Sequence, residues 1–405
     1  MLTTQIRVQR LELAWVLVLL GGMAVVLALA APSEVVGADW WTFSRLGPQT
    51  RDFEYWLAPD AFAGNYWSVG YSAFVGLFLA DPTASTAWLE LAQSAMAIGL
   101  AVMVYGFTFR FGRNVRVVSL SVAVLNPALY GMAWNGGYEI LLSFLLCLAV
   151  LLIWLQGGEL SARNKRTQIL IALSSGLLLG LAALVASKLL LVIVSVLGTL
   201  FIQRFRFSFV TLLGALIPLT SWALRNQFVR STPSPLNTNG PINLWIGNNP
   251  DATLGGYMTP PPLPSGQSSY LEATIMHVLS QPEFTVALTM RKILRLAEPT
   301  YVYPNEVFAP EMLVILHMFT AVLSLGLAFF VLIYAIGRLW AKPPITPPVG
   351  LLAATTLSFF VVHIPFLAEP RFRTPVEPLV IAVAVPTVFY LWRRIRTSFS
   401  ERSGV

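Results

Sequence analysis

The chain has 405 residues, of which 56% are hydrophobic and only 11% are charged. Soluble domains carry about 25% charged residues, so this composition excludes a soluble globular protein. The formal net charge is +7, but its distribution along the chain argues against nucleic-acid binding. The single cysteine excludes intrachain disulfides and CxxC metal sites, and the three histidines have no HxxxH spacing.

Apolar runs long enough to cross a bilayer recur along the chain. A transmembrane helix needs roughly 18 or more apolar residues, and in lipid such a run must be helical so that every backbone group is satisfied. The predicted spans lie at about residues 13–31, 86–109, 117–134, 138–156, two within 168–203, 207–224, 311–337, 349–367 and 375–392. We therefore predict an all-α polytopic membrane protein with about ten transmembrane helices, forming a single domain over residues 1–405.

The first run has an alternative interpretation. It follows Arg7 and Arg10, and LALAAP near its end offers small residues for signal-peptide cleavage. The run is long for the apolar part of such a peptide, so we expect a retained first helix.

Two polar loops are long enough to carry a site, namely residues 33–85 and 225–310. The first loop contains carboxylates among aromatic rings: Glu34, Asp39, Asp52, Glu54, Asp60, Trp40, Trp41, Tyr55, Trp56, Tyr66, Trp67 and Tyr71. This pattern suits either a site for a sugar or cation, or an interfacial aromatic belt with solvated acids. The apolar stretch 66–80 is too short to span, which favours an interfacial or re-entrant helix.

Charge asymmetry orients the predicted helices. One side of the bundle receives 16 of the 26 basic residues but only three of the 19 acidic ones, for net charges of +13 and −6. Positive loops mark the cytoplasmic side. We therefore expect both termini in the cytoplasm and both long loops outside.

A few cations lie at the outer ends of apolar runs. Lys188 sits in a tight turn expected at residues 186–188, and Arg371 and Arg373 lie in the short loop AEPRFRTP. Charges at membrane depth are costly and by default mark a functional site. The alternative is that the side chains snorkel to lipid headgroups.

Several segments, in order, resemble bacterial polyprenyl-phosphate-sugar glycosyltransferases of the GT-C fold, relatives of protein O-mannosyltransferases and of the lipid A aminoarabinose transferase. RNQFVRSTPSPLNTNGPINLWIGNNPDATLGGY is similar to the stretch after the seventh helix, with its Arg-Asn pair and Gly-Asn-Asn-Pro turn. ADWWTF, YWSVGYSAFVGLFLAD, NPALYGMAWNGGYEILLSFLL, GLAALVASKLLL and EPRFRTPVEP resemble further family segments. The prolines of the interfacial helix are absent here, Lys188 replaces an arginine, and Phe372 replaces a tyrosine.

The resemblance implies transfer of a sugar from a polyprenyl phosphate to a lipid, glycan or protein acceptor. Such an enzyme needs a base for the acceptor and cations for the departing phosphate. Asp39 matches the catalytic aspartate of the first loop, with Glu54 and Asp60 as alternatives. The expected phosphate ligands are Lys188, Arg371, Arg373 and Arg225. The expected substrate-binding residues are Trp40, Tyr71, Glu139, Asn248 and Glu369. Glu139 could instead serve the helix dipole, and Asn248 and Asn249 could be turn residues.

Other functions stay open at this point. A lipid-linked saccharide transporter or flippase would need polar residues at the bilayer midplane, which most spans lack. A non-enzymatic membrane scaffold and a surface-glycan polymerase or ligase are the remaining alternatives. Carboxylates could hold a divalent cation, but no spacing requires one. The sequence does not reveal the sugar or the acceptor.

Overall fold

The computed structural model describes residues 2–29, 39–61, 66–134, 136–156, 164–202, 206–252, 261–297 and 347–403. Within these residues the chain is helical and has no strand. Six helices are long and apolar enough to cross a membrane, or seven if a bent pair counts as one span. The chain is thus a multi-pass membrane protein.

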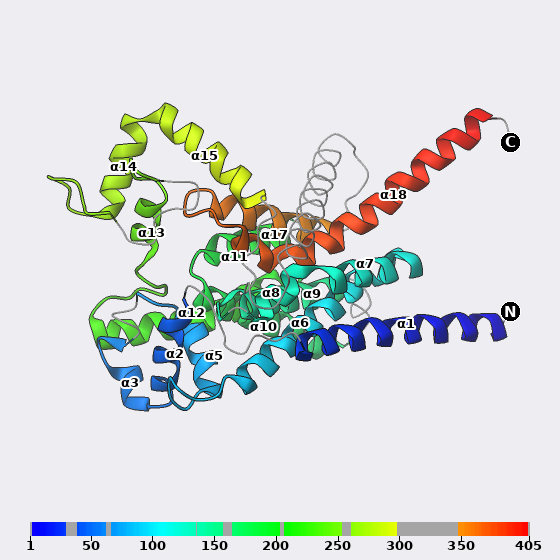
Figure 1. The fold of residues 1–405 in the computed structure, drawn as a ribbon, viewed down its shortest axis with the longest axis horizontal. Coiled ribbons are helices and arrows are strands. Elements are labelled where there is room, and N and C mark those ends of the chain that lie inside the picture. Colours follow the sequence, from blue (N-terminus) through cyan, green and yellow to red (C-terminus); the bar gives the residue numbers. More distant parts are fainter. Residues whose placement is uncertain are drawn as a thin grey trace.

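The apolar helices form a bundle (Figure 1). They are α1 (Leu2–Leu29), α6 (Ala87–Phe107), α7 (Arg113–Leu125), α8 (Pro127–Trp134), α9 (Glu139–Gln156), α10 (Lys165–Val185), α11 (Leu189–Ile202), α12 (Ser208–Arg230), α17 (Pro347–His363) and α18 (Glu377–Ser403). The core includes the first turns of α18, where residues 379–385 are all buried. By contrast, α1 exposes large apolar side chains such as Leu13 and Leu17, as expected for a face turned to lipid.

Small residues bring α10 and α12 into close contact. A Cβ added at Gly176 would lie 2.1 Å from the backbone oxygen of Thr211, and one at Gly214 would lie 2.4 Å from that of Leu173. Membrane helices use small residues in this way because lipid provides no hydrophobic drive for their association. These glycines therefore set the distance between the two helices.

Most predicted spans coincide with helices of the structure. The turn expected at residues 186–188 separates α10 from α11, and the short helix expected within 66–80 is α5 (Val69–Phe78). The predicted span 311–337 lies outside the described residues, so the expected total of about ten spans stays a prediction.

The span predicted over residues 117–134 is a bent pair of helices. Here α7 and α8 meet at an angle of 45°, and together they are long and apolar enough to count as one span. Asn126 has an extended backbone, as expected for a residue that precedes proline. Its side-chain oxygen accepts a hydrogen bond from the backbone N–H of Ala128, at 3.0 Å, and so caps the second helix.

The loop segments gather at one end of the bundle, and both chain termini lie at the other (Figure 1). The loop helices are α2 (Trp40–Gln49), α3 (Phe53–Leu57), α5, α13 (Gly240–Ile246), α14 (Tyr270–Ser280) and α15 (Pro282–Ala297). The 3₁₀ helix η3 (Pro370–Val376) leads into α18. Two loops that are far apart in sequence therefore share one end of the molecule.

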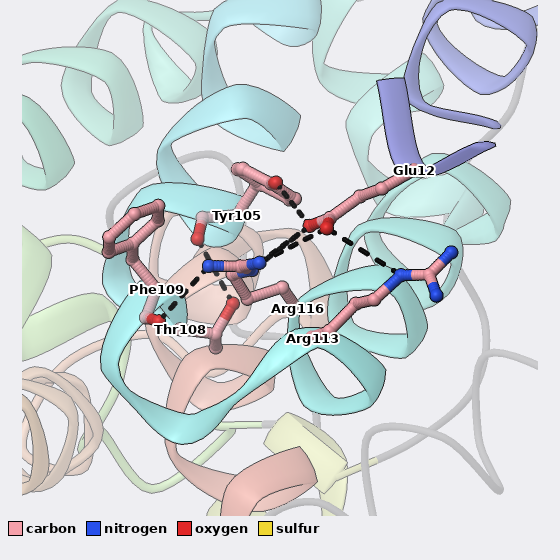
Figure 2. A network of polar contacts seen from close by, with 6 residues as sticks. All are labelled: Glu12, Tyr105, Thr108, Phe109, Arg113 and Arg116. Atoms are coloured by element: carbon pink, nitrogen blue, oxygen red, sulfur yellow. Dashed lines mark hydrogen bonds and ion pairs between the residues drawn. The ribbon is translucent and has the colours of Figure 1, made fainter. Parts of the chain in front are cut away.

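A buried ion cluster ties α1 to α6 and α7 (Figure 2). The Glu12 carboxylate accepts hydrogen bonds from Arg116 Nε and Nη2, both at 3.1 Å, and from the Tyr105 hydroxyl at 2.6 Å. Arg113 lies 3.6 Å from the same carboxylate. Because Glu12 is only 8% exposed, these partners are needed to compensate its charge.

Candidate active site

A cavity of about 430 Å³ lies among the loop segments. Its charged lining comes from Asp39 at the start of α2, Lys188 between α10 and α11, and Glu369 and Arg371 before α18. Its aromatic lining includes Tyr66, Trp67, Tyr138 and Phe372, and asparagines at 237, 239 and 243 complete one wall. Packing thus brings together polar groups from four segments that are distant in sequence.

Arg371 lies among three carboxylates. Its Nε donates to Glu369 Oε2 at 2.6 Å, and its Nη1 lies 3.7 Å from Asp39 Oδ2 and 3.8 Å from Glu139 Oε1. Its side chain is only 12% exposed, so it sits in a low-dielectric place where charge partners matter. The three carboxylates hold the guanidinium at the cavity wall and compensate its charge.

Lys188 presents its ammonium to aromatic faces. Its Nζ lies 4.0 Å from the centre of the Phe372 ring and 5.8 Å from that of Tyr138, distances typical of cation–π contacts. Among the described residues it has no ion pair, and loss of hydration lowers the pKa of Lys188 to about 7, against the opposing effect of Glu139. A negatively charged ligand in the cavity would stabilise the protonated form of Lys188.

The Phe372 ring has a fixed position beneath Lys188. The ring of His363 stacks on it at 5.6 Å with an interplanar angle of 29°. His363 is itself held by its Nδ1, which lies 2.7 Å from the backbone oxygen of Phe359. The end of α17 therefore supports the aromatic floor on which the lysine rests.

Asp39 lies beside an aromatic hydroxyl. Burial and the charge of Asp39 raise the pKa of Tyr66, so this phenol stays neutral and can donate a hydrogen bond. The Asp39 side chain is 20% exposed and thus accessible from the cavity.

The structure places Arg373 away from the cavity. Its Nε donates to Glu377 Oε1 at 3.2 Å and its Nη1 donates to the backbone oxygen of Leu296 at 2.7 Å. Glu377 also accepts from Asn126 at 2.6 Å. Arg373 therefore joins η3 to α15 and to the bend between α7 and α8, in contrast to Arg371 two residues earlier.

The remaining predicted residues also lie outside the cavity lining. Arg225 donates to the backbone oxygens of Trp56 and Ala58, both at 2.7 Å, and so fastens the first loop to α12. Glu54 and Asp60 are exposed on that loop.

Three further predicted residues pack in the interior. Tyr71 is fully buried and accepts a hydrogen bond from Gln93 at 3.0 Å, and Trp40 packs half-buried on the core. Asn248 accepts a hydrogen bond from Lys292 at 2.9 Å. The structure thus brings Asp39, Glu139, Glu369, Lys188 and Arg371 together and places the other predicted residues around them.

Asn237, Asn239 and Asn243 line the cavity although they were not among the predicted site residues. The four-residue spacing of Asn239 and Asn243, beginning at the Gly-Pro start of a helix, could have indicated a common face.

The carboxylates do not fit a divalent cation. Asp39, Glu139 and Glu369 converge on the guanidinium of Arg371, which occupies the place that a cation would take. Across the described ranges, no group of three or more His, Cys, Asp or Glu side chains is placed to hold a metal ion.

The sequence matches no protein-family model and no curated protein. Solved structures of the oligosaccharyltransferase AglB from Archaeoglobus fulgidus are similar. The complex with an inhibitory peptide and a dolichol-phosphate has a TM-score of 0.50 and 13% identity, covering 98% of this chain and 52% of that one. The apo form also has a TM-score of 0.50 and 13% identity, covering 97% and 52%.

This protein has the GT-C fold. The expected fold is confirmed, since helices, membrane character and structural neighbours agree. A third AglB structure, a complex with Zn and sulfate, matches with a TM-score of 0.50 and 13% identity over 95% of this chain and 50% of that one. The chain spans about half the length of the oligosaccharyltransferases that it matches.

Proposed function

We propose that this GT-C protein is a glycosyltransferase that moves a sugar from a polyprenyl-phosphate donor to an acceptor at the outer face of a bacterial inner membrane. The observation that carries the proposal is the convergence of Asp39, Lys188 and Arg371 on one cavity. An ionised carboxylate and two cations are the groups needed for transfer from a phosphate leaving group.

Lys188 and Arg371 bind the donor phosphate. Arginine suits paired hydrogen bonds to phosphate oxygens, whereas lysine acts as a point charge. Among the described residues Lys188 has cation–π contacts with Phe372 and Tyr138 and no ion pair, so an anion adds a favourable interaction without breaking an ion pair there. The fold is compatible with such a ligand, since one AglB structure was determined with a dolichol-phosphate.

Asp39 is the base. The acceptor hydroxyl attacks the anomeric carbon, a new bond forms between acceptor oxygen and carbon, and the bond from that carbon to the phosphate oxygen breaks. The proton of the acceptor moves to Asp39, and the negative charge that develops on the phosphate is stabilised by Lys188 and Arg371. Glu139 and Glu369 hold Arg371 in place during the reaction.

The orientation follows from the predicted charge asymmetry. The cavity is lined by residues of the loop segments, and these segments lie at the end of the bundle opposite the two termini (Figure 1). If the termini are cytoplasmic, the cavity opens on the outer face. A transporter is less consistent with this arrangement because its site would lie at the midplane.

The test is transfer by the purified protein in liposomes. A synthetic decaprenyl phosphate bearing a radiolabelled sugar is supplied with candidate lipid, glycan and peptide acceptors. We expect labelled product together with free decaprenyl phosphate. Movement of the intact labelled lipid between leaflets without cleavage would instead identify a transporter.

A further inference from the structure

One wall of the cavity consists of amide side chains. Asn237 precedes α13, Asn239 stands at its N-cap position and Asn243 follows one turn later. Residues four apart lie on the same face of a helix, so Asn239 and Asn243 present their amides to the cavity together. Ile246 continues this face one turn further.

These amides have unused hydrogen-bonding capacity. None of the three side chains forms a hydrogen bond with another described residue, although all three are half-buried. The Asn237 Oδ1 atom is fully buried and has no donor among the residues that the structure describes. Buried amide groups normally have partners, so this wall is suited to a ligand that both donates and accepts hydrogen bonds.

The amide wall is anchored to the loop that leads to Arg371. Asn248 donates to the backbone oxygen of Pro365 at 2.6 Å, and Lys292 donates to Asn248 at 2.9 Å. At Gly247 an added Cβ would lie 2.6 Å from the backbone oxygen of Phe366, so only glycine permits this approach. These contacts hold the asparagines at a set distance from the cations of the cavity.

We propose that Asn237, Asn239 and Asn243 recognise the hydroxyl groups of the donor sugar, and that this sugar is neutral. The inference rests on the proposed function, which assigns Lys188 and Arg371 to phosphate and Asp39 to the acceptor proton. The groups left for the sugar are uncharged amides, which pair with hydroxyls as donors and acceptors. Nearby aromatic rings of Tyr66 and Trp67 supply apolar faces for the ring of the sugar.

The experiment compares binding of bare and sugar-bearing lipids to the full-length protein in nanodiscs. The probes are decaprenyl phosphate alone and decaprenyl phosphate carrying mannose, glucose, galactose or glucuronic acid. We expect at least one neutral sugar to bind more tightly than the bare lipid phosphate, and the glucuronyl lipid to gain nothing over the bare lipid.

Substitutions test whether the three asparagines cause this gain in affinity. Asn237→Ala and Asn243→Ala should each reduce the affinity gain from the neutral sugar by about tenfold, the effect of losing a hydrogen bond or two. Their affinity for bare decaprenyl phosphate should stay unchanged, which also shows that the variants are folded. Asn114→Ala is the matched control, because Asn114 is exposed at the start of α7, outside the cavity lining.

Each outcome separates the two proposals. If the wild-type protein binds no decaprenyl phosphate, the proposed function fails. If it binds the bare lipid and every glycosylated lipid equally, or if it prefers the glucuronyl lipid, the proposal that the asparagines recognise a neutral sugar is overturned. The proposal of a polyprenyl-phosphate donor is then unaffected. Unchanged sugar selectivity in both asparagine variants also overturns the proposal that the asparagines recognise the sugar.

Discussion

Arg371 Nη1 lies 3.7 Å from Asp39 Oδ2, although the two residues belong to loops near opposite ends of the chain. The pair joins the two groups that the proposed reaction uses for the acceptor proton and for the phosphate. The ion pair with Arg371 holds the Asp39 carboxylate at the cavity wall, where an acceptor hydroxyl could reach it.

Asp39→Asn should lower turnover by about 10²–10⁴, the usual contribution of a positioned base. The amide keeps the shape of the carboxylate but cannot take the proton, so donor binding should change little. Turnover of labelled decaprenyl-phosphate sugar measures the effect. Glu54→Gln and Asp60→Asn are controls because both side chains are exposed outside the cavity lining. If Asp39→Asn stayed active while Glu54→Gln or Asp60→Asn lost turnover, the base would be that other carboxylate and not Asp39.

Arg371 and Arg373 should respond differently to the same substitution. Arg371→Lys keeps a charge but loses paired hydrogen bonds, so we expect KM for the donor to rise by about tenfold or more. Arg373→Lys keeps a charge beside Glu377 but cannot form all the hydrogen bonds of the buried guanidinium, so we expect the fold to be destabilised.

Thermal unfolding in detergent and donor titration separate the two arginines. Arg373→Lys should lower Tm, while its folded fraction binds the donor normally. If Arg373→Lys weakened donor binding without lowering Tm, and Arg371→Lys did the reverse, the roles assigned to these residues would be exchanged.

Donor affinity should depend on pH through Lys188. Its pKa near 7 in the ligand-free protein means that the ammonium is protonated below pH 7 and neutral above it. A phosphodiester donor keeps its negative charge over this range, so the dissociation constant should rise by about tenfold between pH 6 and pH 8.

Two variants test this assignment. Lys188→Arg carries a permanent charge and should remove the pH dependence, whereas Lys188→Met should bind weakly at both pH values. A pH dependence that persists in Lys188→Arg would have to come from another group.

Cysteine labelling tests the predicted orientation. The native Cys147 is fully buried, so it should give little background with a membrane-impermeant maleimide. A cysteine at Thr232 should react in intact cells, and one at Asn114 only after permeabilisation, because both sites are exposed but belong to opposite predicted sides. The reverse pattern would invert the topology and put the cavity on the cytoplasmic face.

Hydropathy alone determined the helical, multi-pass character of the chain. In lipid a long apolar run has to satisfy its own backbone, so a helix is the only solution, whatever its neighbours are. The lengths of the apolar runs also predicted the turn at residues 186–188 and the short helix α5. The cost of placing a charge at membrane depth indicated that Lys188 and Arg371 belong to a site.

Only the tertiary structure decided which polar groups meet. Arg371 and Arg373 are equivalent by sequence criteria, but the path of η3 brings one to the cavity and the other to Glu377. The amide wall depends on contacts of Asn248 with Pro365 and Lys292, which lie far away in the chain. Hydropathy reports how each segment partitions into lipid, whereas the site depends on distances between segments, which are set by helix packing.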